Sequence, residues 1–278
     1  MSLSIGKTRD AGPSLRCLGI NLAAWTALLG RPRRFKASRL LPPWRRLALG
    51  GLAGIVLVAL AMRFLDARSL TFVRTLPPAV VDTFNEITDF GQSGWFLMPL
   101  AALILIAAIA ATPAAGRIAS LVVTSLAVRL EFLFLAIALP GLVVTIVKRL
   151  IGRVRPSDLG PFSYVPWSWR PDYASLPSGH GTTAVAAAIA IGALWPKARV
   201  PMWAFAVVIA VSRVVIQAHF ASDVIAAAFV GAFGAILVRN WFAARRLAFT
   251  VDRDGTVRAL AGPSLRRLKM VARRLLGQ

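Results

Sequence analysis

The sequence has two histidines, His180 and His219, and the second has neighbours that suit nucleophilic chemistry. Asp223 follows His219 by four residues, and Arg213 precedes it by six. A carboxylate at that spacing can accept a hydrogen bond from one ring nitrogen and leave the other free to attack. If residues 219–223 are helical, the pair shares one face, whereas if Ser222 caps a helix the contact is made in a turn. Either geometry makes His219 a candidate nucleophile.

The other histidine ends the segment Pro177-Ser178-Gly179-His180, at the start of an apolar run. Ser178 is a good helix N-cap. The free N–H groups and the positive dipole end of a first helical turn suit a phosphate, and Gly179 lets a ligand come close to the backbone. An ordinary capped helix start would explain Ser178 but not the histidine beside it. The segment therefore indicates a phosphate site.

A third segment is rich in cations: Lys148, Arg149, Arg153 and Arg155 lie within eight residues and are followed by Pro156. Cations that only anchor a helix end would gather mainly on the cytoplasmic side of a membrane. The topology described below places these four on the outer side, so we interpret them as part of an anion site. Lys148 and Arg155, together with Arg213, are candidate phosphate ligands, with backbone N–H groups of Ser178 and Gly179 completing the clamp.

The elements that must position these residues are membrane helices. Of the 278 residues, 57% are hydrophobic, and the mean hydropathy is +0.68. Several apolar runs approach the ~20 residues that a helix needs to cross ~30 Å of hydrocarbon. We predict an all-α, polytopic membrane protein with a six-transmembrane-helix bundle. The predicted crossings are 47–65, 95–114, 127–147, 178–195, 200–217 and 223–241.

Charge sets the expected orientation. Residues 1–46 and residues 239–278 each carry ten Lys and Arg, out of a net charge of +22. The positive-inside rule places both basic ends in the cytoplasm, where they meet anionic lipid, and this distribution argues against nucleic-acid binding. We expect a basic N-terminal segment, 1–46, a membrane domain, 47–241, and a basic tail, 242–278. All three chemical segments then lie on the same outer side.

Several features have alternative interpretations. Arg129 and Glu131 lie at the cytoplasmic boundary of the third crossing or form a buried functional pair. Asp82, Glu86 and Asp89 form the solvated face of a surface helix or a metal site. The aromatic segment 157–176 is a belt at the lipid headgroups, a lid that selects the headgroup, or both.

The C-terminal tail contains two expected elements. Residues 249–259 alternate around Asp254-Gly255 and predict a small hairpin. Residues 263–276 place apolar side chains at helical spacing opposite arginines, which is typical of an interfacial helix on anionic lipid.

The three segments resemble the signature motifs of the type 2 phosphatidic acid phosphatase family of membrane lipid phosphatases. Lys-x6-Arg-Pro is Lys148 to Pro156, Pro-Ser-Gly-His is Pro177 to His180, and Ser-Arg-x5-His-x3-Asp is Ser212 to Asp223, without departure from the pattern. The resemblance covers about residues 148–223.

The resemblance implies a role for each matched residue. His219 attacks phosphorus and carries a phosphohistidine, Asp223 orients it, and His180 protonates the leaving oxygen and later activates water. The phosphate ligands are Lys148, Arg155, Ser178, Gly179 and Arg213. The family needs no metal or cofactor, and the sequence has no His/Asp/Glu cluster near the motifs.

The predicted function is hydrolysis of a lipid phosphate or diphosphate at the periplasmic face of a bacterial inner membrane. Undecaprenyl diphosphate, phosphatidylglycerophosphate, phosphatidic acid and lipid A 1-phosphate all fit. The alternative is a lipid phosphotransferase with a non-water acceptor. Vanadium-dependent haloperoxidases share the oxyanion cage but are soluble, which the six spans contradict. A transporter would distribute polar residues through the spans instead of gathering them at one end.

Overall fold

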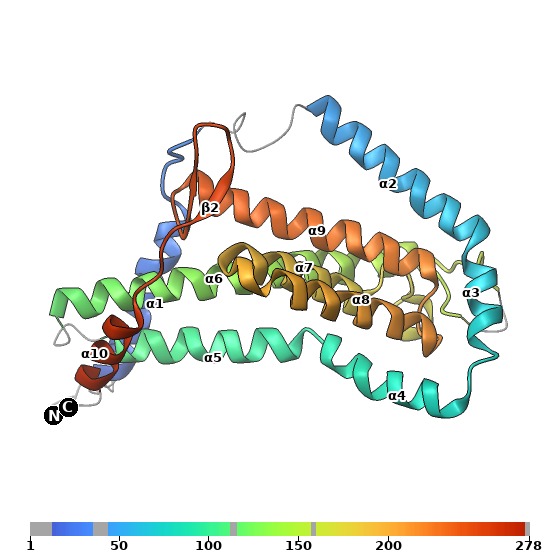
Figure 1. The fold of residues 1–278 in the computed structure, drawn as a ribbon, viewed down its shortest axis with the longest axis horizontal. Helices are drawn as coiled ribbons and strands as arrows, with labels where there is room; N and C mark the ends of the chain where they lie inside the picture. Colours follow the sequence, from blue (N-terminus) through green and yellow to red (C-terminus); the bar gives the residue numbers. More distant parts are fainter. Residues whose placement is uncertain (1–12, 36–43, 112–115, 157–159, 276–278) are drawn as a thin grey trace, which may run out of the picture.

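A computed structural model of the chain describes residues 13–35, 44–111, 116–156 and 160–275. Within them the fold is a bundle of α-helices with one β-hairpin (Figure 1). The α-helices are α1 (Pro13–Leu29), α2 (Trp44–Phe64), α3 (Asp66–Val73), α4 (Pro78–Thr88), α5 (Gly94–Ala110), α6 (Gly116–Ile151), α7 (Gly179–Leu194), α8 (Arg199–Val215), α9 (Ala221–Ala244) and α10 (Leu265–Leu275). Short 3₁₀ turns are η2 (Asp89–Gly91), η4 (Pro171–Tyr173) and η5 (Pro196–Ala198).

The membrane character that the sequence predicts is confirmed. Five helical stretches of the described chain are long and apolar enough to cross a bilayer: Trp44–Phe64, Pro78–Ala110, Gly116–Ile151, Pro196–Val215 and Ala221–Ala244. The predicted crossing at 178–195 corresponds to α7, which has only 16 residues and so spans roughly 24 Å. A crossing by α7, which would bring the number to six, therefore stays a prediction. The end of the predicted span 95–114 lies outside the described residues.

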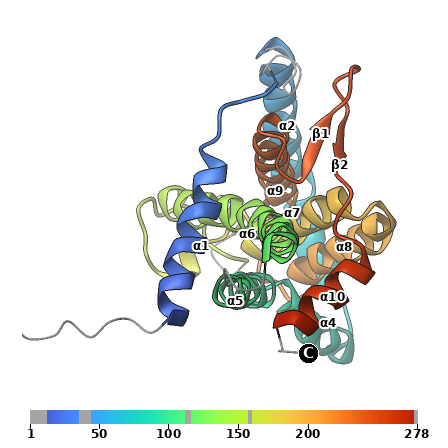
Figure 2. The same cartoon turned by 90° about the vertical axis from the view of Figure 1, so that its left-hand side faces the viewer.

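The short helix α7 is the centre of the bundle, between α6, α8 and α9 (Figure 2). Its residues are mostly Ala, Gly and Thr, and most of them are buried. Small side chains let the neighbouring backbones approach closely. At Gly231 in α9, an added Cβ would lie 2.6 Å from the carbonyl oxygen of Thr182 in α7. Because other helices surround α7, most of its surface meets protein instead of lipid.

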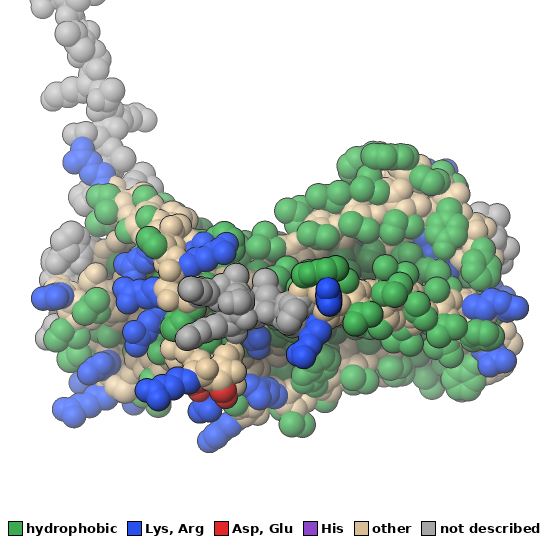
Figure 3. All heavy atoms as spheres, turned by 90° about the horizontal axis from the view of Figure 1, so that it is seen from above, with side chains coloured by type: hydrophobic (Ala, Val, Ile, Leu, Met, Phe, Trp, Pro, Cys, Tyr) green, Lys and Arg blue, Asp and Glu red, His purple; other side chains and the backbone are tan. Residues whose placement is uncertain are grey.

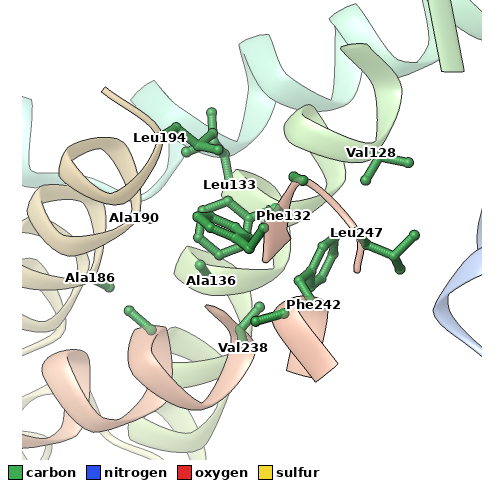
Figure 4. Close-up of a cluster of buried hydrophobic side chains, with 14 of the residues drawn as sticks. Val128, Phe132, Leu133, Ala136, Ala186, Ala190, Leu194, Val238, Phe242 and Leu247 are labelled. Carbon is green, nitrogen blue, oxygen red and sulfur yellow. The ribbon is translucent and has the colours of Figure 1, made fainter. Parts of the chain in front are cut away.

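A hydrophobic cluster joins α6, α7 and α9 to the hairpin (Figure 4). The ring of Phe132 packs edge-on against Phe242 and Phe249, with centroid distances of 5.4 and 4.7 Å. Phe249 belongs to β1 (Phe249–Val251), which pairs antiparallel with β2 (Val257–Ala259). The predicted hairpin is confirmed, and the buried side chains of β1 pack against α6 and α9.

Helix α6 is longer than the sequence suggested. It begins at Gly116, not near Ala127, and has 36 residues. Arg129 and Glu131 therefore lie inside the helix, and they do not pair with each other, since residues two apart point in different directions. Arg129 donates to the carbonyls of Leu260 and Ala261 at 2.9 and 3.1 Å, which ties α6 to the chain after β2. Their depth in the bilayer stays a prediction.

Cations gather at the hairpin end of the molecule. Figure 3 shows most Lys and Arg side chains on its left-hand part, which in Figure 1 carries the hairpin, while hydrophobic side chains cover most of the rest. Helix α10 lies at the same end, and Val271, only 4% exposed, packs it onto a second hydrophobic cluster with Trp25 of α1. Residues 1–12 and 36–43 of the predicted basic segment lie outside the described chain.

Candidate active site

The three chemical segments meet at the end of the bundle away from the hairpin and α10 (Figure 1). They are the end of α6 with its following loop, the start of α7, and the turn between α8 and α9. Direct contacts join them: the backbone N–H of Ser178 donates to the carbonyl of Asp223 at 3.1 Å, and that of Ser175 donates to the carbonyl of Arg153 at 3.0 Å. Residues more than 40 positions apart in the sequence therefore share one site.

The contact between His219 and Asp223 is made at the start of a helix. Helix α9 begins at Ala221, so His219 lies just before it and Asp223 lies in its first turn. Nδ1 of His219 is 3.7 Å from Oδ2 of Asp223, which is longer than a hydrogen bond. The geometry is a turn, but Ser222 is not the cap: its N–H and hydroxyl both donate to Asp66, at 2.9 and 2.6 Å.

Asp223 is fully buried and held from several directions. Its Oδ2 accepts from the Ser175 hydroxyl at 2.5 Å and from the backbone N–H of Phe220 at 2.9 Å. Its Oδ1 is 2.6 Å from Nη1 of Arg153. These bonds fix the rotation of the carboxylate and leave Oδ2 facing the histidine.

Arg153 has a different role from the one its cluster suggests. It is 0% exposed and forms ion pairs with two buried carboxylates, Asp66 and Asp223, at 2.7 and 2.6 Å. Arg149 donates to the carbonyls of Trp169 and Arg170 in the loop before α7. Of the four clustered cations, Lys148 and Arg155 are therefore left for a phosphate.

The predicted phosphate ligands border the two histidines. Arg213 is 7% exposed, and its Nη1 donates to the Thr88 hydroxyl at 2.8 Å. Within the described residues, the buried side-chain atoms without a hydrogen-bond partner include Nε of Arg155, Nε of Arg213 and Nδ1 of His219. Buried donors are costly when they are unpaired. The two guanidinium nitrogens fit a site that binds an oxyanion, whereas Nδ1 of His219 faces Oδ2 of Asp223 at 3.7 Å.

Lys148 and Ser178 complete this group. Lys148 is half-buried in the last turn of α6. Ser178 is the N-cap of α7, and its hydroxyl accepts from the backbone N–H of Gly181 at 3.4 Å, as the sequence predicts. Gly179 has no atom within 4 Å of an added Cβ, so the space in front of the first turn of α7 is open.

His180 faces a segment that the sequence analysis did not connect with the site. An added Cβ on Gly91 of η2 would lie 3.1 Å from Cδ2 of His180. Asp89, Arg213, Arg155 and His219 all act electrostatically on this ring. The connection between α4 and α5 therefore forms one wall of the site.

Electrostatics favour a neutral His219. Burial lowers the pKa of the His219 imidazole, and although Asp223 opposes this, the nearby guanidinium groups of Arg213 and Arg155 lower the pKa further. Burial also lowers the pKa of the Arg155 guanidinium. For Arg153, burial would lower the pKa, but Asp223 and Asp66 outweigh it and raise the pKa. A neutral imidazole is the form that can attack phosphorus.

The aromatic segment is anchored to the site loop. The backbone N–H of Val165 donates to the Gly152 carbonyl at 2.7 Å, and Arg153 forms a β-bridge with Tyr164. Gly152 has φ +64°, and an added Cβ would lie 1.8 Å from the Val165 carbonyl oxygen, so this approach requires glycine. Trp167 and Trp169 are 75% and 82% exposed, which suits both the belt and the lid. Residues 157–159 lie outside the described chain.

The acidic residues of α4 and η2 lie on the outside of these helices. Asp82, Glu86 and Asp89 are exposed. Among the residues that the structure describes, no three His, Cys, Asp or Glu side chains are grouped so that they could hold a metal ion. Their place on the solvated face of a surface helix stays a prediction.

Fold and site together define a helical membrane protein that gathers two histidines, an aspartate and several cations at one end. The sequence profile of the PAP2 superfamily matches residues 130–247. Lipid A 1-phosphatase of Rhizobium etli is 34% identical over 205 residues, which are 71% of this chain and 86% of that protein. The lipid A 1-phosphatase of Rhizobium johnstonii is 39% identical over 127 residues, 45% of this chain and 52% of that protein.

Two solved structures align with parts of this chain at TM-scores below 0.5. LpxE of Aquifex aeolicus has a TM-score of 0.47 and 20% identity, covering 63% of this chain and 94% of that one. A PAP2-type phosphatidylglycerolphosphate phosphatase of Bacillus subtilis has a TM-score of 0.46 and 18% identity. The alignment covers 81% of this chain and 94% of that one. On the sequence matches, the chain belongs to the PAP2 superfamily, the lipid phosphatase family that its motifs resemble.

Sequence reasoning did not assign Asp66, Thr88 or Gly91 to the site, and it counted Arg153 among the cations of an anion site, whereas Arg153 pairs with Asp66 and Asp223. Arg153 is an unspecified position inside Lys-x6-Arg-Pro, and its sequence spacing alone did not separate it from Arg155. Asp66 is 156 residues from Ser222, its hydrogen-bond donor. The one sequence signal for Asp66 was its position as an acidic residue at the end of an apolar run.

Proposed function

We propose that this protein hydrolyses a phosphate from a membrane lipid through a phosphohistidine on His219. The observation that carries the proposal is the buried His219 beside Asp223, with unpartnered donor atoms of Arg155 and Arg213 in the same site. A neutral nucleophile next to cations that neutralise phosphate oxygens is what in-line phosphoryl transfer requires.

In the first step, Nε2 of His219 attacks phosphorus while the bond from phosphorus to the lipid oxygen breaks. His180 gives its proton to that oxygen, so the lipid leaves as an alcohol, or as a monophosphate when the substrate is a diphosphate. Asp223 accepts the hydrogen bond of Nδ1–H and stabilises the positive charge that forms on the ring. The present separation of 3.7 Å shortens when the ring becomes cationic.

In the second step, water attacks the phosphohistidine and the P–N bond breaks. His180 takes the proton from the water, inorganic phosphate leaves, and His219 becomes neutral again. Lys148, Arg155, Arg213 and the backbone N–H at Gly179 hold the phosphate oxygens throughout. The backbone N–H of Ser178, which the sequence predicted as a further donor, instead donates to the carbonyl of Asp223 at 3.1 Å. The phosphotransferase alternative differs only here, where a hydroxyl other than water would attack.

Lipid A 1-phosphate is the substrate that we propose to test first, because two lipid A 1-phosphatases are 34% and 39% identical to this chain. Purified protein in detergent with EDTA is given lipid A, undecaprenyl diphosphate, phosphatidylglycerophosphate and phosphatidic acid in parallel. We expect fastest phosphate release from the 1-position of lipid A. Equal release from all four would leave only the broader lipid phosphatase function, and labelled donor lipid shows whether the phosphate goes to water or to another hydroxyl.

The orientation is part of the proposal. We propose a bacterial inner membrane, six crossings including α7, both basic ends in the cytoplasm and the site at the periplasmic face. The site and the cation-rich hairpin end lie at opposite ends of the bundle, which supports it (Figures 1 and 3). Single cysteines at Trp169 and Arg267, in a Cys17→Ser background, should react with an impermeant maleimide from the periplasm at 169 only.

The basic ends are expected to lie on anionic lipid. In α10, Leu268 and Val271 face the bundle while Arg266, Arg267 and Lys269 are exposed. Each such cation contributes roughly 1 kcal/mol to attraction by an anionic surface.

A further inference from the structure

The buried ion network next to His219 contains more negative charge than its own stability explains. Arg153 lies between Asp66 and Asp223, and all three side chains are 0% exposed. One guanidinium balances one carboxylate, so the three groups sum to about one negative charge. Unbalanced buried charge is costly. It is reasonable where a positive charge develops during the reaction, as on the attacking ring of His219.

Arg153 has no donor left for a substrate. Its Nε and Nη2 donate to the Pro161 carbonyl at 3.1 and 2.9 Å, and Nη2 also donates to Asp66. Nη1 donates to Ser222 and Asp223 at 2.7 and 2.6 Å. These bonds use the five N–H donors of a guanidinium. The group also stacks on Phe220 at 4.3 Å. Arg153 therefore acts on the carboxylates and not on phosphate.

The network is arranged as a chain that ends at the histidine. Asp66, the first residue of α3, holds one nitrogen of Arg153 and both donors of Ser222. Arg153 holds Oδ1 of Asp223, which leaves Oδ2 directed at His219.

We propose that Asp66 and Arg153 are positioning residues that act on the reaction through Asp223. The inference rests on the proposed role of His219 as nucleophile. Asp66 keeps Arg153 from fully neutralising Asp223, and Arg153 fixes the rotation of its carboxylate. Together they maintain the negative oxygen that stabilises the cationic ring.

The first test replaces Asp66 by asparagine, which keeps the shape and removes the charge. We expect kcat on the best lipid substrate to fall about ten- to hundredfold, which is the loss found when a residue that hydrogen-bonds to a metal-ligating side chain is replaced. KM should stay within about twofold of wild type. Asp66→Glu, which keeps the charge, should recover part of this loss. The matched control is Asp82→Asn on the exposed face of α4, which should change neither constant. A normal kcat in Asp66→Asn, or a change in KM alone, would overturn the proposal.

The second test asks whether Asp66 acts through Asp223. In an Asp223→Asn background, Asp66→Asn should lower kcat by less than about twofold, because residues that act as a unit are not additive. Losses that multiply would mean that Asp66 acts independently of Asp223.

If Asp66→Asn does not fold in detergent, Ser222→Ala gives the same test without a charge change. It removes the hydroxyl between Arg153 and Asp66, so we expect a severalfold lower kcat. This loss should be absent in the Asp223→Asn background, and an unchanged kcat in Ser222→Ala would contradict the proposal.

His219→Ala, assayed beside these variants, separates this inference from the proposed function. An active His219→Ala would remove the proposed function, whereas an inactive one beside a normal Asp66→Asn would remove only this inference.

Discussion

The two ends of the bundle are stabilised in different ways. At the hairpin end, Phe132, Phe242 and Phe249 form an aromatic cluster with aliphatic neighbours from α6, α7 and α9 (Figure 4). At the site end, the most deeply buried groups include Asp66, Arg153 and Asp223, which are held by ion pairs and hydrogen bonds. A packed apolar cluster contributes stability directly, while a buried ion network contributes little net stability and much specificity of arrangement.

The residues that stabilise the fold most and the residues proposed to carry out the reaction therefore lie at different ends of the molecule. Changes at the hairpin end should lower the free energy of unfolding and leave the rate of each folded molecule unchanged. Changes at the site end should alter the rate first.

Replacing the nucleophile should have the largest effect. His219→Ala removes the attacking nitrogen, so we expect kcat for phosphate release to fall about 10⁴-fold or more, as for loss of a covalent nucleophile. Thermal unfolding in detergent should stay close to wild type. Activity within tenfold of wild type would show that another group attacks phosphorus.

Arg213→Lys tests the phosphate cage. The substitution keeps a charge but loses the planar donors, so kcat should fall about 10²-fold, in the range found for one lost transition-state donor. Arg239→Lys in the last turns of α9, near the hairpin end, is the matched control and should keep its kcat. Similar losses in both variants would remove the contrast between the ends.

Phe132→Ala tests the hairpin end. Phe132 is 0% exposed, and truncating a buried phenylalanine costs roughly 3–5 kcal/mol of unfolding free energy. Unfolding should shift accordingly, while kcat per folded molecule stays unchanged. If kcat falls in the folded fraction, the two ends are coupled.

The pH profile tests the electrostatics of the site. Because burial lowers the pKa of His219, with Arg213 and Arg155 lowering it further against Asp223, the nucleophile stays neutral below its ordinary pKa of about 6.5. The acid limb of kcat/KM should therefore lie below that pH. Asp223→Asn removes the group that raises this pKa and should move the limb to still lower pH. A limb that moves upward would contradict the assignment.

Charge removal on α10 should have the smallest effect on catalysis. With Arg266, Arg267 and Lys269 changed to glutamine, we expect kcat within about twofold of wild type, since these exposed cations contribute only to surface attraction. Reconstituted protein with and without anionic lipid is the measurement. A large loss of kcat would mean that the hairpin end takes part in the reaction.

Local patterns predicted much of this arrangement. Hydropathy runs gave the helices, Ser178 gave the start of α7, and Asp-Gly gave the hairpin, because each depends on neighbours in the chain. The length of α6 was underestimated, since the prediction allowed only the ~20 residues that cross the hydrocarbon, whereas the helix continues to Gly116. The role of Arg153 was missed because its partner Asp66 is 87 residues away, and such a pairing depends on tertiary packing.

The proposed mechanism depends on a covalent bond between His219 and phosphorus. Trapping the phosphorylated protein tests this most directly. Purified protein is mixed with ³²P-labelled lipid phosphate and quenched in alkali, where a phosphohistidine survives, and then the labelled peptide is identified by mass spectrometry. We predict label on His219 in the wild type, loss of that label in acid, and none in His219→Ala. Label on another residue, or rapid turnover with no labelled protein at any time, would contradict the account.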